Sequence, residues 1–182
     1  MSGQIRAMRG DPFGQLLALE EQLQASRVDS VAGTSQNWIG LGFRIGERWF
    51  VAPREDVREV IPQPPSTHIP NAASWLRGLA NVRGELLAIV DLAGLLGLTP
   101  SETHRAQRVL VLNSRRIPAG LLVDEVAGYR QFTVGEQRNE LVRAAQPFTP
   151  YLLGAFVHEG QPWLAMSLHK VALGDAFRTA AL

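Results

Sequence analysis

The residue types that most often carry out chemistry are present in this 182-residue chain, but their spacing does not assemble a reaction centre. The four histidines are far apart, and none has a second histidine or a carboxylate at the spacing of metal ligands. If the acidic couples at 55–56 and 124–125 lie in strands, their side chains point to opposite faces, which does not suit a general acid and base pair. Because the chain has no cysteine, thiolate nucleophiles and cysteine-based metal sites are excluded. We therefore predict no catalytic residue, no metal, no cofactor and no enzymatic activity.

Nucleotide binding is not predicted either. Gly40-Leu41-Gly42, with Gly46 further on, superficially resembles a dinucleotide-binding loop. It lies inside a predicted strand, however, and lacks the following helix whose amide groups would face a pyrophosphate. The motifs of serine hydrolases, zinc proteases and phosphate-binding loops are absent from the sequence.

The charge balance disfavours a phosphate-rich partner. Eighteen basic residues against seventeen acidic ones leave a formal net charge of +1, so the chain lacks the excess positive charge typical of nucleic-acid and anionic-membrane binders. Arg105, Arg108, Arg115 and Arg116 could form a local patch, but no aromatic residue is interleaved with them to stack bases. A solvated hairpin tip is the favoured interpretation of these arginines, and nucleic-acid binding stays open as the alternative.

No targeting or membrane-spanning segment is predicted. Glu20-Glu21 interrupt the N-terminal apolar run far short of a signal-peptide core. The longest later apolar stretch runs from Leu86 to Val90 and ends at Asp91, which is too short for a membrane span. We therefore expect a cytoplasmic protein.

The elements that must position any binding residues change in character near residue 38. Residues 1–37 are predicted to be an N-terminal amphipathic helix and a linker, because Asp11-Pro12 supplies an N-cap and a proline at the first helical position. From Trp38 on, short aliphatic and aromatic runs alternate with turns, which predicts strands. We expect hairpins of 38–45 with 48–52, 79–82 with 86–90, 108–113 with 117–123, and 152–158 with 162–168, a strand at 57–61 that stops at Pro62, and a helical turn around 73–76.

An internal repeat organises these strands. Residues 78–92 align without a gap onto residues 154–168, and a Val-x-Glu-Val tetrad lies upstream of each copy, at 57–60 and 123–126. Chance similarity between two hairpins is the alternative interpretation. We predict an all-β fold of two small barrels in series, at about 38–105 and 106–171, with an insertion near 135–145 and a C-terminal tail or helix at 172–182.

One constellation has the geometry of a binding surface. In a barrel, the turn that contains Asn81, Arg83 and Gly84 would place the guanidinium of Arg83 beside the strand that carries Glu59. Arginine offers a rigid fork of donors and a carboxylate accepts two of them, while Gly84 lets the chain turn with a positive φ. Such a pair would fasten a hairpin tip to a neighbouring strand and leave a shaped surface. An exposed arginine and glutamate that never meet is the alternative.

At these residues the chain resembles the CheW-like adaptor family of bacterial chemosensory systems. The family pattern is Val-x-Glu-Ile or Val, then Gly-x-x-Asn-Leu-Arg-Gly, then an apolar strand that ends in Asp-Leu. This chain has Val82 in place of the leucine and Ala88 where the family often has proline. The resemblance covers about residues 38–171, and the overall length and N-terminal helix are similar to the adaptors of type IV pilus twitching-motility pathways.

The resemblance implies two five-stranded SH3-like barrels related by a pseudo-twofold, and a scaffold role without catalysis. The implied partners are the regulatory domain of a CheA-type histidine kinase and the cytoplasmic tip of a chemoreceptor, through which the protein would join membrane receptor arrays; no nucleic acid and no direct membrane insertion are implied, and self-association stays open. The family's contact region, carried over to this chain, contains Val57, Glu59, Val60, Gly78, Asn81 and Arg83. In it the Glu59–Arg83 pair would shape the surface and the two valines would supply buried interface area.

Two other interpretations compete with the adaptor. Seventeen of the eighteen basic residues are arginine. A nucleic-acid or ribosome-associated protein built of SH3-like barrels would account for this arginine bias and predicts salt-sensitive binding to RNA. A small-molecule-binding or enzymatic barrel would need a polar pocket, which the motifs do not supply.

Overall fold

The computed structural model describes residues 37–99 and 105–179, so the predicted N-terminal helix and most of its linker lie outside the described residues. All four predicted hairpins are present, with boundaries close to those expected. The described strands are β1 (Asn37–Ile45), β2 (Arg48–Pro53), β3 (Val57–Pro62), β4 (Leu76–Val82), β5 (Glu85–Asp91), β6 (Arg108–Leu112), β7 (Ala119–Val123), β8 (Glu125–Thr133), β9 (Leu152–His158) and β10 (Gln161–Met166).

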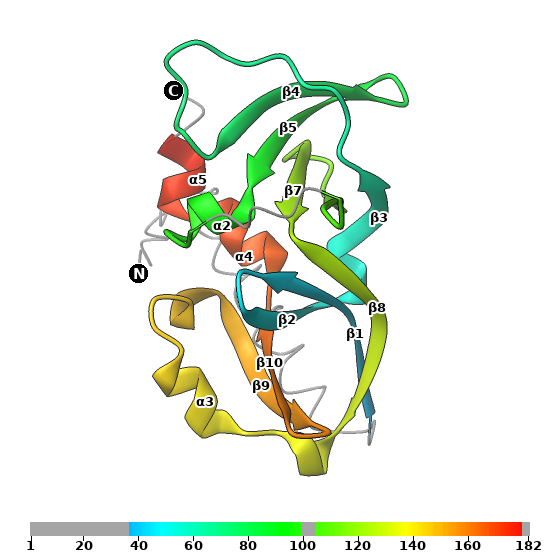
Figure 1. Cartoon of the computed structure of the whole chain (residues 1–182), viewed down its shortest axis with the longest axis vertical. Helices are drawn as coiled ribbons and strands as arrows, with labels where there is room; N and C mark the ends of the chain where they lie inside the picture. Colours follow the sequence, from blue (N-terminus) through cyan, green and yellow to red (C-terminus); the bar gives the residue numbers. More distant parts are fainter. Residues whose placement is uncertain (1–36, 100–104, 180–182) are drawn as a thin grey trace, which may run out of the picture. The chain divides into compact units, whose positions relative to one another are not determined.

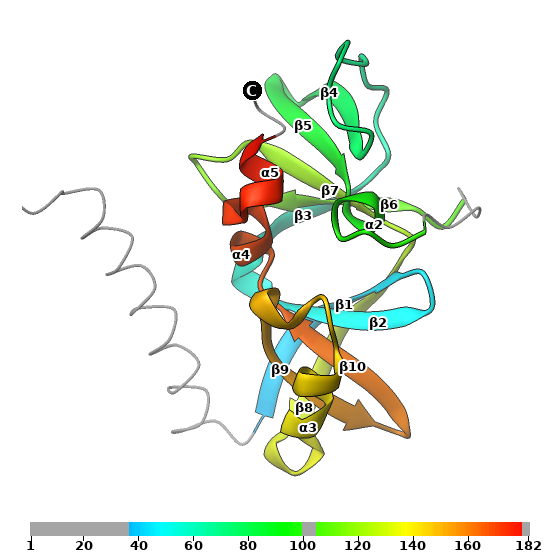
Figure 2. The ribbon, with the colours of Figure 1, turned by 90° about the vertical axis from the view of Figure 1, so that its left-hand side faces the viewer.

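These strands form two five-stranded sheets, each curved into a small barrel (Figure 1, Figure 2). The first barrel has the strand order β8-β1-β2-β10-β9, and the second has the order β3-β6-β7-β5-β4. An isolated bridge between Gln137 and Phe156 joins the segment after β8 to β9, and a bridge between Thr67 and Leu79 joins the segment after β3 to β4. Each bridge brings the two ends of one sheet together, so the predicted all-β fold with two five-stranded barrels is confirmed.

The predicted division into barrels at about 38–105 and 106–171 is wrong, because the two halves of the chain exchange strands. β1 and β2 precede the second barrel in the sequence, yet β1 pairs with β8 and β2 pairs with β10, both of which follow it. Parallel pairing of β2 with β10 and of β5 with β7 fixes the exchange. A repeat shows which segments are alike, but the open edge of a hairpin can accept a strand from either copy. Sequence likeness therefore could not decide which copies pair.

The repeat itself is present in the backbone. Gly78 in β4 and Gly154 in β9 each follow a β-bulge at the same place in the hairpin. The two hairpin tips have positive φ at both central residues, 54° and 87° for Arg83-Gly84 and 50° and 79° for Glu159-Gly160. Positive φ at both positions is the geometry that joins strands through a two-residue turn. The hairpins β4-β5 and β9-β10 are thus equivalent units, one in each barrel.

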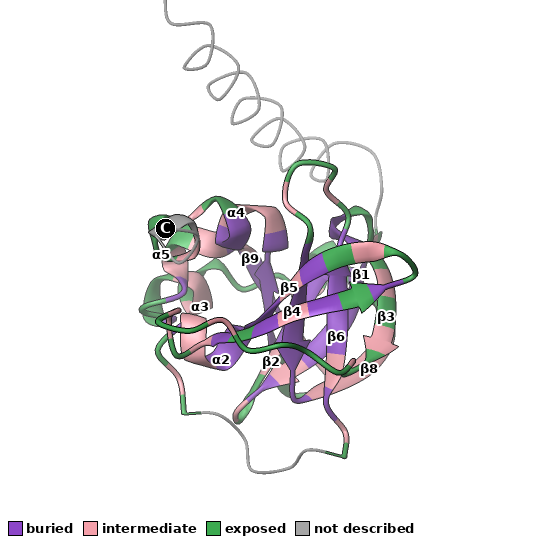
Figure 3. Ribbon diagram, turned by 90° about the horizontal axis from the view of Figure 1, so that it is seen from above, coloured by how far each residue is buried: buried purple, intermediate pink, exposed green. Residues whose placement is uncertain are grey.

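Three clusters of buried apolar side chains hold the described domain together (Figure 3). The largest lies between the barrels and contains side chains from both sheets, such as Phe50 and Leu110. The cluster of the second barrel is aliphatic, and that of the first barrel is dominated by aromatic rings. The aliphatic cluster contains Ala80, Val82, Leu87, Ile89, Val109, Val111 and Leu122; the aromatic one contains Val51, Phe132, Phe156, Trp163 and Ala165.

A short helix follows each of the two equivalent hairpins. The Asp91 side chain caps α2 (Leu92–Leu95) by accepting from the Gly94 amide at 3.2 Å. The Ser167 hydroxyl caps α4 (Leu168–Leu173) by accepting from the Lys170 amide at 3.3 Å. The C-terminal helix α5 (Asp175–Thr179) follows, and its Phe177 stacks on the indole of Trp75 with ring centroids 6.2 Å apart.

Other segments differ from the sequence-based prediction. The helical turn expected around 73–76 is a single hydrogen-bonded turn, in which the amide of Leu76 donates to the carbonyl oxygen of Ala73 at 2.9 Å, and β4 already begins at Leu76. The strand β8, from Glu125 to Thr133, was not among the predicted strands. The predicted insertion holds η2 (Val134–Glu136) and α3 (Asn139–Ala144), followed by η3 (Thr149–Tyr151), and the short η1 (Arg54–Asp56) precedes β3. No helix within 37–99 or 105–179 is long and apolar enough to cross a membrane.

Candidate functional site

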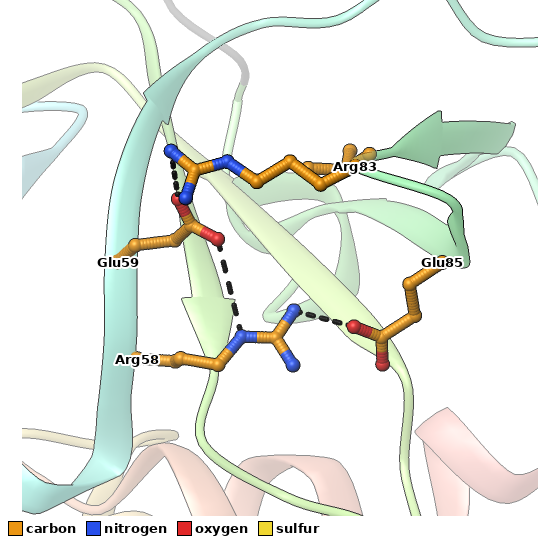
Figure 4. Close-up of a pocket in the computed structure, with 5 residues that line it drawn as sticks. Arg58, Glu59, Arg83 and Glu85 are labelled. Carbon is orange, nitrogen blue, oxygen red and sulfur yellow. Dashed lines mark hydrogen bonds and ion pairs between the residues drawn. The ribbon is translucent and has the colours of Figure 1, made fainter.

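The candidate site lies at the open end of the second barrel, where β3 faces the tip of the β4-β5 hairpin (Figure 4). β3 and β4 are the two ends of the sheet order, so a side-chain link from β3 to the hairpin tip spans the opening of the barrel. Nη2 of Arg83 lies 3.0 Å from Oε2 of Glu59. The predicted ion pair is therefore formed. The Arg83 side chain is 79% exposed and that of Glu59 is 21% exposed, so the pair is a surface feature.

The Asn-x-Arg-Gly motif builds the turn that presents Arg83. Oδ1 of Asn81 accepts a hydrogen bond from the backbone amide of Gly84 at 2.9 Å. This contact stabilises a turn in which Arg83 itself adopts a φ of 54°, a left-handed conformation that side chains other than glycine and asparagine rarely take. The turn thereby holds the guanidinium above the barrel opening, within reach of Glu59.

A second ion pair, which the sequence motifs did not predict, lies beside the first. Nη2 of Arg58 lies 2.7 Å from Oε2 of Glu85, and Nε of Arg58 lies 4.0 Å from Oε1 of Glu59. Strict strand alternation would put Arg58 and Glu59 on opposite faces. A β-bulge intervenes, because Val57 pairs with Leu112 and Glu59 already pairs with Val111, which leaves Arg58 as the additional residue. The bulge turns Arg58 toward the same opening as Glu59.

The four charged side chains form one row of alternating sign, in the order Glu85, Arg58, Glu59 and Arg83, which we call the charge row (Figure 4). Together with Val82 the charge row lines an open depression of about 370 Å³. Val82 belongs to the aliphatic cluster of the second barrel, so the depression has an apolar wall beneath charged side chains. This composition suits contact with a protein surface, because protein interfaces combine an apolar centre with a polar rim.

Two of the six residues carried over from the family are structural. Val57 is 8% exposed and packs in the cluster between the barrels, so it cannot supply interface area to a partner. Gly78 is buried with a φ of 137°, and a β-carbon there would lie 2.2 Å from the carbonyl oxygen of Thr67. Gly78 is therefore needed for the approach of the Thr67 segment to β4.

The other carried-over residues are accessible. Glu59, Asn81 and Arg83 meet at the hairpin tip, as described above. Val60 is 39% exposed, but it pairs with Leu110 and therefore lies on the opposite face of β3 from Glu59. A partner that contacted both Glu59 and Val60 would have to reach around the edge strand.

Two histidine contacts lie away from the charge row. Nδ1 of His158 lies 2.5 Å from Oε1 of Glu136, and Oε2 of the same carboxylate accepts from the amide of Thr133 at 2.7 Å. The Thr133 amide foremost, and the His158 ring next, lower the pKa of Glu136 below its ordinary value of 4.5. In the second contact, Nδ1 of His169 lies 2.9 Å from Oδ1 of the buried Asp56. Within 37–99 and 105–179 no three histidine or acidic side chains gather as metal ligands would.

The glycine pair that superficially resembled a nucleotide loop lies within β1, as expected. A β-carbon on Gly40 would lie 2.5 Å from the carbonyl oxygen of Ala52, and one on Gly42 would lie 3.0 Å from the indole of Trp163. Both glycines therefore permit close packing of β1 against β2 and the aromatic cluster.

The chain is similar in sequence to known proteins of one family. Residues 40–173 match the CheW-like domain family. Protein PilI of Pseudomonas aeruginosa is 38% identical over 173 residues, which cover 94% of this chain and 97% of PilI. The chemotaxis protein CheW of Thermotoga maritima is 24% identical over 131 residues, or 72% of this chain and 85% of that protein. The expected similarity to pilus-pathway adaptors is therefore confirmed at the level of sequence.

A solved structure shows the same fold. The scaffolding protein TtCheW from Thermoanaerobacter tengcongensis superimposes with a TM-score of 0.64 at 20% identity, covering 76% of this chain and 94% of TtCheW. The family match covers the strands of both barrels, including β3 with Glu59 and the turn with Arg83. With its two exchanged barrels, its motif residues at the hairpin tip and a relative aligned along nearly the full length, the chain belongs to the CheW-like family.

Proposed function

We propose that this protein is a non-catalytic adaptor that couples chemoreceptors to a CheA-type histidine kinase, in a chemosensory system that controls type IV pilus twitching motility. The observation that carries the proposal is the Glu59–Arg83 pair beside the depression, because it is formed by the motif residues of a family whose relatives include chemotaxis proteins and PilI. The partners would be the kinase regulatory domain and the cytoplasmic tip of a receptor, and the adaptor would act in the cytoplasm, held at receptor arrays by these partners.

The energetics of the site support recognition as its role. An ion pair with one side chain 79% exposed contributes about 1 kcal/mol or less to folding. The fold therefore gains little from Arg83, whose left-handed φ itself costs free energy. A residue held at such a cost on an exposed tip is better explained by contact with a partner, and arginine is enriched among residues that dominate binding.

The lining of the depression supports a role without catalysis. Its side chains are two arginines, two glutamates and a valine, and the carboxylates are engaged by the arginines. The depression is open, and the carboxylates that could act as nucleophiles are paired with the arginines, so it fits a protein contact better than the enclosed site of a small substrate.

The proposal is tested by titrating the full-length chain against the isolated regulatory domain of the CheA-type kinase from the same organism. We expect Arg83→Ala to weaken binding about tenfold or more. Arg115→Ala is the matched control, because Arg115 is an exposed arginine on the connection between β6 and β7 and we expect no change there. If the folded wild-type chain binds neither the kinase domain nor a receptor cytoplasmic fragment, the proposed function is wrong.

The cellular part of the proposal has its own test. Deleting the gene should abolish or strongly reduce twitching, and the wild-type gene should restore it. An allele with Arg83→Ala should restore twitching poorly while the protein accumulates to its normal level. Unchanged twitching in the deletion strain would contradict the pilus assignment and leave the kinase-binding test to decide the adaptor role.

A further inference from the structure

We propose that Arg58 and Glu85 determine which partner this adaptor accepts, because they set the order of charges that a partner must match. This inference rests on the proposed adaptor function and concerns the same surface. The partner would present a charge sequence of opposite sign, with an acidic side chain facing Arg58 and a basic side chain facing Glu85.

The first support is that Arg58 and Glu85 are positions which the site uses but the motif does not fix. Arg58 occupies the variable place in Val-x-Glu-Val, and Glu85 follows the Asn-x-Arg-Gly turn. The bulge at Arg58 brings both side chains to the depression, with 2.7 Å between Nη2 of Arg58 and Oε2 of Glu85. The Glu59–Arg83 pair of the family motif is thus extended by the Arg58–Glu85 pair, whose residues the motif does not specify.

The second support is that the pair contributes little to the fold. The side chains of Arg58 and Glu85 are 38% and 42% exposed, and such surface pairs stabilise a protein only weakly. Their charges stay in contact with solvent at the rim of the depression, where an approaching protein meets them. Charges at the rim of an interface act mainly on partner choice and association rate.

The third support is that the charge row is neutral in sum. Two arginines and two glutamates cancel, so the row does not attract a partner through net charge. Discrimination must then come from order, because a partner in the wrong register would place like charges against each other, which is costly. A polyanion such as RNA would face Glu85 and Glu59 as well as the arginines, and is disfavoured.

The test separates the order of the charges from the existence of the pair. Arg58→Glu and Glu85→Arg each reverse one charge, whereas the double variant R58E/E85R keeps an ion pair with its polarity reversed. Binding of each full-length chain to the isolated regulatory domain of the CheA-type kinase from the same organism would be measured at low and moderate salt. Unfolding midpoints would be measured alongside, and the neutral double variant R58Q/E85Q replaces any single reversal that fails to fold.

We expect the double reversal to unfold at or slightly below the wild-type midpoint, because the negative charge placed at position 58 then lies beside Glu59. We expect it to bind about tenfold or more weakly at low salt, with a smaller difference at higher salt. Wild-type affinity of the double reversal would show that only the pair matters and would overturn the inference, as would wild-type affinity in every variant. Both results would leave the adaptor function intact, since wild type still binds. A wild-type chain that does not bind the kinase domain would instead overturn the proposed function and this inference with it.

Discussion

The open ends of the two barrels have equivalent backbones and different chemistry. In the second barrel, the tip Arg83-Gly84 is joined to β3 through arginine and glutamate side chains. In the first barrel, His158 immediately precedes the equivalent tip, and its ring joins Glu136 in η2, after β8. The same hairpin is thus connected to the segment across the opening in both barrels, by two permanent cations in one and by a histidine in the other.

We interpret this difference as two roles for the repeated hairpin, one structural and one in binding. Glu136 also accepts hydrogen bonds from the Thr133 amide and hydroxyl, in a capping box at η2. Its contacts therefore stabilise the fold itself. Among the residues that the structure describes, the partners of the charge-row carboxylates are arginine side chains, and the row lies at the surface. The first barrel accordingly encloses an aromatic cluster, whereas the second presents its charges around an open depression. We infer that the second barrel carries the recognition surface.

The largest expected effect on stability comes from substituting the equivalent glycines of the two hairpins, Gly78 and Gly154. Gly78→Ala should destabilise the protein by about 2–5 kcal/mol, because the new β-carbon would lie 2.2 Å from the Thr67 carbonyl oxygen at a φ of 137°. Gly154→Ala should be neutral or stabilise by up to about 1 kcal/mol, since nothing lies within 4 Å of that position and the substitution restricts the unfolded chain. Denaturant unfolding of both variants measures the contrast. Equal effects in the two barrels would show that the bridge from Thr67 to Leu79 does not constrain the second.

A smaller difference in stability is expected between substitutions of two buried aspartates, each of which forms hydrogen bonds to a distant part of the chain. Oδ2 of Asp56, before β3, accepts from the amide of Leu168 at 2.8 Å, and its Oδ1 meets His169. Asp124, before β8, accepts from the amide of Gly46 at 2.6 Å. Asp56→Ala should cost about 3 kcal/mol and Asp124→Ala about 1–2 kcal/mol, because the first removes more hydrogen bonds to a charged group. Thermal or urea unfolding of the two variants gives the comparison, and a larger loss for Asp124→Ala would contradict it.

Much of the fold and half of the site could be predicted from the sequence. Period-two patterning with turn residues located the four hairpins, because hairpins depend on residues close in the sequence. The contact between Arg83 and Glu59, which are far apart in the sequence, was predicted by placing the motif residues on a barrel. The exchange of strands between halves could not be predicted, since both copies offer equivalent edges. Arg58 was missed because the β-bulge in β3 turns its side chain to the face opposite the one expected from strand alternation. The residue types in β3 do not indicate where the bulge lies.

The burial of Val57 was missed for a related reason. Val57 and Val60 were both expected at the interface, but one packs between the barrels and the other is exposed. The two valines differ in burial because Val57, at the start of β3, packs into the cluster between the barrels, whereas Val60 lies outside that cluster. The packing of Val57 depends on the strand exchange. Sequence pattern therefore identified the right strand and assigned one of its residues the wrong environment.

The pH dependence of stability should contain a contribution from Glu136, which joins the open end of the first barrel. The pKa of Glu136 is lowered in the folded protein, so its ionised form stabilises the fold above its ordinary value of 4.5, and this contribution is lost as the pH falls through the lowered pKa. Glu136→Gln should thus destabilise near neutral pH, and the difference from wild type should shrink in acid. Unfolding free energies at a series of pH values measure it. Glu140→Gln, an exposed glutamate on α3, is the control, and a difference from wild type that stayed constant with pH would contradict the assignment.

The smallest expected effect is the coupling between Glu59 and Arg83 in the folding of the free protein. A double-mutant cycle with Glu59→Ala and Arg83→Ala should give a coupling of about 0.2–1 kcal/mol in unfolding free energy, because Arg83 is 79% exposed. The same cycle in kinase binding should give a larger coupling if the pair is recognised as a unit. A coupling in folding of about 2 kcal/mol or more would make the pair a structural fastening, as in the first barrel. The two open ends would then be alike in kind, and recognition would have to rest on Arg58 and Glu85 alone.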